Sequence, residues 1–122
     1  MLRPVAAPSQ LVHGDLTGNV LFDDELPPAI IDFSPYWRPV TYAAAIVIAD
    51  ALVWEGADHQ ILRAVSHVGD FGQYLARALI FRIVTDWILT TSKLSGSARP
   101  GPGPWAGAVD LAGQLARAGR SD

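Results

Sequence analysis

The sequence contains no cysteine. Disulfide bonds, thiolate metal ligands and a cysteine nucleophile are therefore excluded, and any chemistry must use oxygen and nitrogen groups. Basic residues are also scarce, because nine Lys and Arg stand against twelve Asp and Glu, which gives a formal net charge of -3. A broad basic surface for a nucleic-acid backbone or an anionic lipid is not expected from this balance. We therefore expect neither nucleic acid nor membrane as a partner.

A long uninterrupted apolar run is missing as well. The most apolar stretch, residues 75–89, is broken by Arg77, Arg82 and Asp86. Charges at these positions predict that the stretch does not span a membrane. The first residues also lack the apolar run of a secretory signal. We therefore expect a cytoplasmic protein.

The composition is that of a folded domain. The chain has 122 residues, of which 50% are hydrophobic and 17% are charged, enough material for one hydrophobic core. We predict a single α+β domain, mainly helical, with one small β-hairpin. Its predicted parts are an irregular lead-in over 1–10, two functional loops over 11–34, a helical region over 35–94, a Gly/Pro-rich loop over 95–104 and a terminal helix over 105–119.

The hairpin and the helices follow from the pattern of residues. β-favouring runs at 20–22 and 29–33 flank an acidic connection that contains two prolines, which predicts a hairpin. Pro35 and Pro39 break the chain, and Pro39 suits the first turn of a helix that ends near Trp54. A longer helix is predicted after Asp70. Both helices are apolar on almost every side, so we expect them to need a neighbour, either a missing N-terminal lobe or a second copy of the chain.

Polar residues gather in the short segment HGDLTGN of residues 13–19, and Asp32 follows beyond the hairpin in the segment IIDF. Phosphoryl transfer needs one carboxylate at the acceptor hydroxyl, and a second carboxylate with an amide oxygen to hold magnesium on the phosphates. Asp15, Asp32 and Asn19 supply these three groups. Their place on loops at the ends of short strands would let them converge.

The segments HGDLTGNVLF and IIDF resemble the catalytic loop and metal-binding motif of the aminoglycoside phosphotransferase and choline kinase families. The close resemblance covers residues 11–34, and a looser one extends to Trp54. It implies the C-terminal lobe of a protein-kinase-like fold, with ATP as phosphate donor, Mg²⁺ as cofactor and a small-molecule hydroxyl as acceptor. Asp15 would then be the catalytic base, Asp32 the principal magnesium ligand and Asn19 a second one.

Within this resemblance His13 belongs to the catalytic loop and would brace the loop rather than react. One departure concerns the spacing between Asp15 and Asn19. Three residues separate the two, whereas kinases have four. Gly18 could absorb the tighter turn.

Three further residues are candidates for roles around this site. Asp50 is the one charge in a very apolar helix, so it either hydrogen-bonds the backbone of the catalytic loop or lies at the polar edge of the helix. Tyr36 and Trp37 follow the metal-binding segment. They either line a pocket for the acceptor or serve in packing.

Parts that hold phosphate in kinases are lacking in this sequence. It contains no G-x-G-x-x-G segment, and its sole lysine is Lys93, far along the chain. Because positioning supplies most of the catalysis of phosphoryl transfer, we expect the chain to be the catalytic C-terminal part of a kinase, inactive by itself. The alternative is a non-catalytic remnant or protein-interaction module that keeps the same fold. The residues do not identify the acceptor, and they leave open a naturally short protein, a mis-started reading frame and a decayed gene.

Overall fold

The computed structural model describes residues 2–93 and 103–118. It is an α+β structure, mainly helical, as the sequence predicts. The strands are β1 (Gln10–His13), β2 (Val20–Leu21), β3 (Ala29–Ile30) and β4 (Pro35–Arg38). The helices are α1 (Val40–Val53), the 3₁₀-helix η1 (His59–Val65), α2 (Phe71–Lys93), the 3₁₀-helix η2 (Gly103–Trp105) and α3 (Ala106–Ala118).

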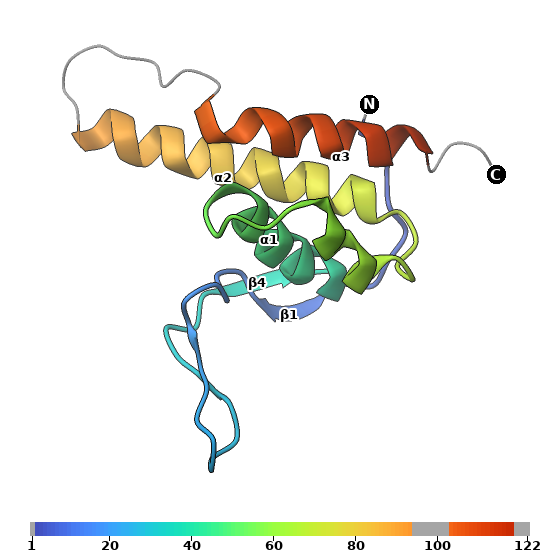
Figure 1. Ribbon diagram of the computed structural model, residues 1–122. Coiled ribbons are helices and arrows are strands. Elements are labelled where there is room, and N and C mark those ends of the chain that lie inside the picture. Colours follow the sequence, from blue (N-terminus) through green and yellow to red (C-terminus); the bar gives the residue numbers. More distant parts are fainter. Residues whose placement is uncertain (1, 94–102, 119–122) are drawn as a thin grey trace.

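The elements stack in layers (Figure 1). Helix α2 lies between α3 and α1, and it packs against both. On the other side of α1 lies a two-stranded sheet of β1 and β4. The segment with β2 and β3 projects away from this body as a separate hairpin. This arrangement explains why α1 is apolar almost all round, since it is covered on two sides.

The core forms where α1 meets α2. Ala45, Ile46 and Ala49 of α1 and Leu75, Ala78 and Leu79 of α2 are buried together. Alanines at the facing positions leave room for the two helices to approach closely, and the larger side chains fill the space between them. Trp105, Ala108 and Ala112 extend this core towards α3. The described lead-in residues, 2–9, have no regular secondary structure, and Val5 and Ala7 pack against the core.

The predicted hairpin is present. Val20 pairs with Ile30 and Leu21 with Ala29 in antiparallel register. Helix α1 and helix α2 also lie where the sequence predicts helices, and α3 matches the predicted terminal helix within the described residues. Residues 95–102 of the predicted Gly/Pro-rich loop lie outside the described residues.

Strand β4 differs from the prediction of a helical region that begins at residue 35. Residues Pro35–Arg38 pair antiparallel with β1, with Val12 opposite Tyr36 and His13 opposite Pro35. The physical reason lies in Pro39, which directly follows the strand. Proline disfavours the helical conformation of the residue before it, and this keeps Arg38 extended before Pro39. The extended stretch then pairs with β1, which already runs alongside.

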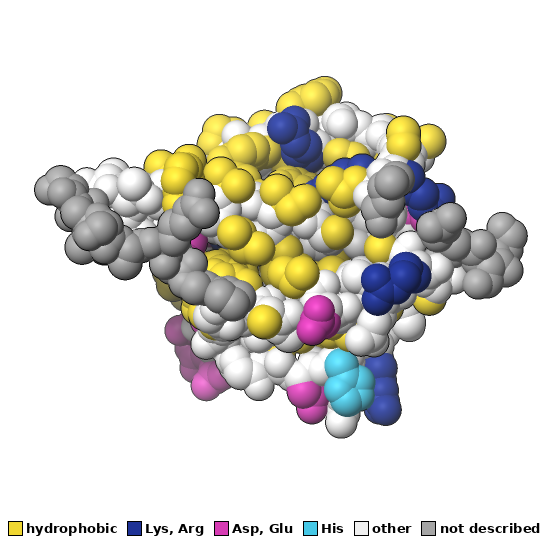
Figure 2. Space-filling view, turned by 90° about the horizontal axis from the view of Figure 1, so that it is seen from above, with side chains coloured by type: hydrophobic (Ala, Val, Ile, Leu, Met, Phe, Trp, Pro, Cys, Tyr) yellow, Lys and Arg dark blue, Asp and Glu magenta, His cyan; other side chains and the backbone are white. Residues whose placement is uncertain are grey.

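The described residues expose large hydrophobic side chains in several places, and two groups of them stand out. One is the outer side of the helices, where Ile80, Val84, Trp87 and Ile88 of α2 and Val109 of α3 are exposed. Figure 2 shows hydrophobic side chains gathered on this face. The other part is the hairpin. No described helix combines the length and the apolar character needed to cross a membrane.

Candidate functional site

The segment HGDLTGN of residues 13–19 begins where β1 ends at His13. It closes with a tight turn, in which the backbone N–H of Asn19 donates to the carbonyl oxygen of Leu16 at 2.9 Å. Gly18 occupies the third position of this turn with a φ of +79°, a conformation that favours glycine. The turn therefore accommodates the short spacing between Asp15 and Asn19.

His13 links the two loops of the site. The backbone N–H of Asp15 donates to His13 Nδ1 at 3.0 Å, so the ring proton lies on Nε2. That nitrogen then donates to the carbonyl oxygen of Ile31, 3.1 Å away, and the ring meets Phe33 edge-on with centroids 5.4 Å apart. Both ring nitrogens are thus engaged with the backbone. His13 braces the loops in this structure and has no free nitrogen for proton transfer.

Asn19 is held by its amide nitrogen. Nδ2 donates to the backbone carbonyl of Asp15 at 2.8 Å, and the backbone carbonyl of Asn19 accepts from the N–H of Ile31 at 3.0 Å. The first bond orients the side chain through its nitrogen, and the second joins the backbone of Asn19 to that of Ile31. The amide oxygen, which is the atom that a magnesium ion uses, is not needed for them.

Asp32 directly follows Ile31, whose backbone N–H donates to the carbonyl oxygen of Asn19. Its backbone φ is +46°, in the left-handed region that costs about 1 kcal/mol or more for a residue other than glycine. Aspartate tolerates this region better than most residues. The chain holds it there because Ile31 is bonded to Asn19 and His13 before it, and Ser34 accepts from the N–H of Gly14 after it, at 2.8 Å. Asp32 therefore lies in a tight bend that residues of the segment 13–19 hold on both sides.

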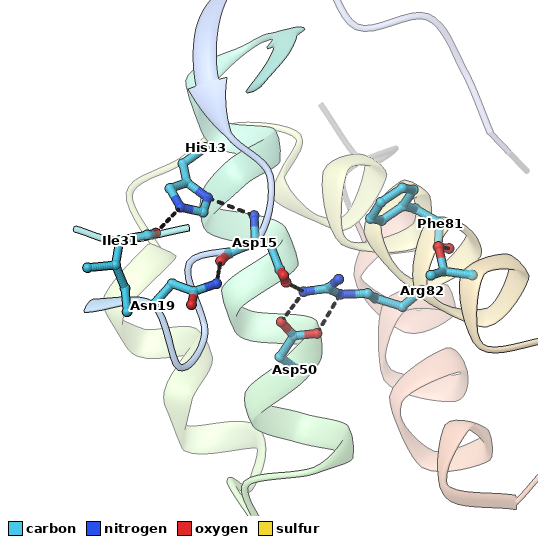
Figure 3. A network of polar contacts seen from close by, with 8 residues as sticks. His13, Asp15, Asn19, Ile31, Asp50, Phe81 and Arg82 are labelled. Carbon is cyan, nitrogen blue, oxygen red and sulfur yellow. Dashed lines mark hydrogen bonds and ion pairs between the residues drawn. The ribbon is translucent and has the colours of Figure 1, made fainter. Parts of the chain in front are cut away.

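The Asp15 side chain pairs with Arg82, which comes from α2 (Figure 3). Arg82 Nη2 donates to Asp15 Oδ1 at 2.8 Å and to Asp50 Oδ2 at 2.5 Å, and Arg82 Nε donates to Asp50 Oδ1 at 2.7 Å. The side chain of Asp50 is 2% exposed, that of Arg82 12% and that of Asp15 46%. Asp50 is thus buried, as one of the two sequence-based alternatives requires, but the partner of its carboxylate is Arg82 and not the loop backbone.

These contacts favour the charged form of the Arg82 side chain. Burial alone lowers the pKa of its guanidinium, but hydrogen bonds to Asp50 and Asp15 outweigh this effect and hold the pKa above the ordinary arginine value. Sequence reasoning noted Arg82 only as a break in an apolar run. A usable signal existed, since Arg82 lies seven residues after Leu75 and therefore on the same buried stripe of α2.

Tyr36 and Trp37 point to different surroundings. The Tyr36 ring lies against Gly14, so that a Cβ built on Gly14 would stand 2.3 Å from a ring carbon. It also meets the Phe81 ring edge-on, with centroids 5.8 Å apart. Trp37 is 65% exposed. Tyr36 thus packs against Gly14 and Phe81, whereas Trp37 is largely exposed. An acceptor pocket at either ring stays a prediction.

Gly14→Ala is expected to destabilise the chain, because the new methyl group collides with the Tyr36 ring. Overpacking of this kind costs about 1–3 kcal/mol. Urea unfolding measures the change. The matched control is Gly107→Ala in α3, where a Cβ meets nothing within 4 Å, and alanine there is expected to be neutral or stabilising by up to about 1 kcal/mol. In a Tyr36→Ala background the cost of Gly14→Ala should largely vanish. An undiminished cost there would show that the ring is not responsible.

Asp32 and Asn19 carry donor atoms of the kind that a magnesium ion takes at a phosphate site. Mg²⁺ takes hard oxygen ligands, and in phosphate-transfer sites it uses one or two carboxylates together with phosphate oxygens. The Asp32 carboxylate and the Asn19 amide oxygen are of this kind, and Thr17 Oγ1, two residues before Asn19, is buried without a hydrogen-bond partner among the described residues. Within 2–93 and 103–118, no group of three or more His, Asp or Glu is placed to hold a metal by itself.

Comparison with protein-family models, curated proteins and solved structures finds no match to this chain. The functional interpretation consequently rests on the residues of the two loops and on the contacts between them.

Proposed function

We propose that the chain is the catalytic part of a magnesium-dependent phosphotransferase of the aminoglycoside phosphotransferase type, which transfers the γ-phosphate of ATP to a hydroxyl of a small molecule. One observation carries the proposal. The loop with Asp15 and Asn19 and the bend with Asp32 are clamped together by hydrogen bonds of His13, Asn19 and Gly14. Such a clamp keeps a base and metal ligands on neighbouring loops, as phosphoryl transfer requires.

Asp15 is the proposed base. Its Oδ1 is taken by Arg82, and its half-exposed side chain leaves Oδ2 for the acceptor. The acceptor oxygen forms a bond to the γ-phosphorus, its proton passes to Asp15, and the bond from the γ-phosphorus to the β–γ bridging oxygen breaks, so that ADP leaves. Asp32 and Asn19 would hold Mg²⁺, which supplies positive charge to the phosphate oxygens.

The proposed enzyme also needs a lobe that holds the phosphates. The sequence has no G-x-G-x-x-G segment. On the hairpin next to the site, Leu21, Phe22 and Ile30 are exposed, Phe22 to 79%. Exposed apolar side chains on and directly after short strands favour coverage by another body. We therefore propose that a phosphate-holding lobe, within the same protein or from a partner, covers the hairpin.

Transfer of labelled phosphate from ATP tests the proposal. The chain is assayed alone and together with an N-terminal lobe of a kinase from the families that it resembles, against aminoglycosides, amino-alcohols and sugars. We expect a labelled acceptor only with the lobe present, and only with magnesium. If the completed protein neither binds nucleotide nor labels any acceptor, the chain is not a phosphotransferase.

The alternative is a protein-interaction module without catalysis. The observation that favours it is the exposed apolar face of α2, with Ile80, Val84 and Trp87, which lies on a different part of the chain from the loops. A module of this type would bind its partner equally well after Asp15→Asn and Asp32→Asn. A phosphotransferase would lose turnover in both variants.

A further inference from the structure

Arg82 connects three segments that are distant in sequence. It extends from α2 to Asp50 on α1 and to Asp15 on the loop after β1 (Figure 3). Neither the resemblance nor the sequence pattern assigns it a role. Its position beside Asp15 raises the question of what the contact does for that carboxylate.

The guanidinium of Arg82 donates two hydrogen bonds to Asp50 and one to Asp15. Asp50 accepts from Nε and Nη2 with both carboxylate oxygens, which is the two-pronged geometry that fixes a guanidinium plane. Asp15 accepts from the remaining hydrogen of Nη2 with one oxygen only. The Phe81 ring lies 5.7 Å from the guanidinium carbon and adds a further contact. Arg82 is thus anchored on the buried side and presents a donor on the exposed side.

A donor fixed in this way restricts the Asp15 side chain. The backbone of Asp15 is already held, since its N–H bonds to His13 and its carbonyl accepts from Asn19. The remaining freedom is rotation about the Cα–Cβ and Cβ–Cγ bonds. A hydrogen bond from an anchored donor to Oδ1 selects one staggered position, and it leaves Oδ2 pointing away from Arg82.

We propose that Arg82 is a positioning residue that holds the Asp15 carboxylate in a single rotamer, with Oδ2 presented to the acceptor hydroxyl. The catalytic purpose of this arrangement rests on the proposed function, whereas the positioning itself is a property of the chain. Lysine would be a poor replacement, because a point charge on a flexible stem cannot bond both oxygens of Asp50 and one of Asp15 in a fixed plane.

Side-chain couplings in the full chain test the positioning directly. Three-bond couplings from Asp15 Cγ to its own backbone nitrogen and carbonyl carbon report the rotamer about Cα–Cβ. In the wild type we expect values of one staggered rotamer. In Arg82→Met they should shift towards the average over three positions, and in Arg82→Lys part of the way. Asp58, whose carboxylate accepts from the N–H of Gln60, is the internal control, and its couplings should stay unchanged.

Arg82→Met leaves Asp50 buried without a partner and can prevent folding, so Asp50→Leu/Arg82→Met provides a second, apolar version of the same test. If Asp15 keeps one rotamer in a folded chain without Arg82, the positioning role is refuted. Phosphate transfer by the completed protein is a separate readout. If the couplings shift but no transfer occurs, the proposed function is refuted and the positioning is upheld. If transfer occurs but the couplings do not shift, the positioning is refuted and the proposed function is upheld.

Discussion

Asp50→Ala is expected to lower the free energy of unfolding by about 3–5 kcal/mol, the range found when one partner of a buried ion pair is removed. The loss is large because Arg82 is almost buried and would keep only its single bond to half-exposed Asp15. Two of its donors would lose their acceptors. Since small domains are stable by only about 5–15 kcal/mol, the variant should unfold at a much lower urea concentration.

The matched control for this change is Asp58→Ala, which removes an exposed carboxylate that caps η1 and should cost about 1 kcal/mol. Joint replacement by Asp50→Leu and Arg82→Met is expected to recover much of the stability lost in Asp50→Ala, because apolar residues of similar size avoid the unpaired charge. If Asp50→Ala lowers the free energy of unfolding no more than Asp58→Ala does, the account of a buried ion pair is contradicted.

Local patterns in the sequence were sufficient for most of the fold. The β-favouring runs around the acidic connection predicted the hairpin, and the prolines and apolar periodicity predicted α1 and α2. Strand β4 was missed because its extended shape depends on pairing with β1, more than twenty residues earlier, and because no alternation marks the segment PYWR. Pairing between distant strands is a tertiary property that propensity alone does not determine.

The site, like the fold, could be predicted from the sequence only in part. The motif predicted which loops would carry Asp15, Asn19 and Asp32, and the resemblance described His13 as a brace. The Arg82 contact was missed, although Asp50 and Arg82 each interrupt a buried apolar stripe. Two opposite charges on facing buried stripes predict an ion pair, since neither is stable there alone. That inference requires knowledge that α1 and α2 face each other, which the sequence did not supply.

The second large effect concerns catalysis by the proposed phosphotransferase, completed by a phosphate-holding lobe. Asp15→Asn should lower turnover by about 10²–10⁴-fold, the usual contribution of a general base, and should leave nucleotide binding largely intact because Asp15 does not hold the metal. Asp32→Asn should instead abolish magnesium-dependent nucleotide binding. Asn19→Ala should be milder than Asp32→Asn, since Asn19 is the second of the two proposed ligands. Turnover and nucleotide affinity, measured separately for each variant, distinguish these roles.

The most direct measurement is the rate of phosphate transfer from labelled ATP to a hydroxyl acceptor by the completed protein, with wild type and Asp15→Asn compared in the same magnesium-containing assay. The account predicts transfer by the wild type, a loss of at least about 100-fold in the variant and equal nucleotide binding by both. Equal rates for the two proteins, or no transfer by either to any acceptor, would contradict the claim that these loops form a phosphotransfer site.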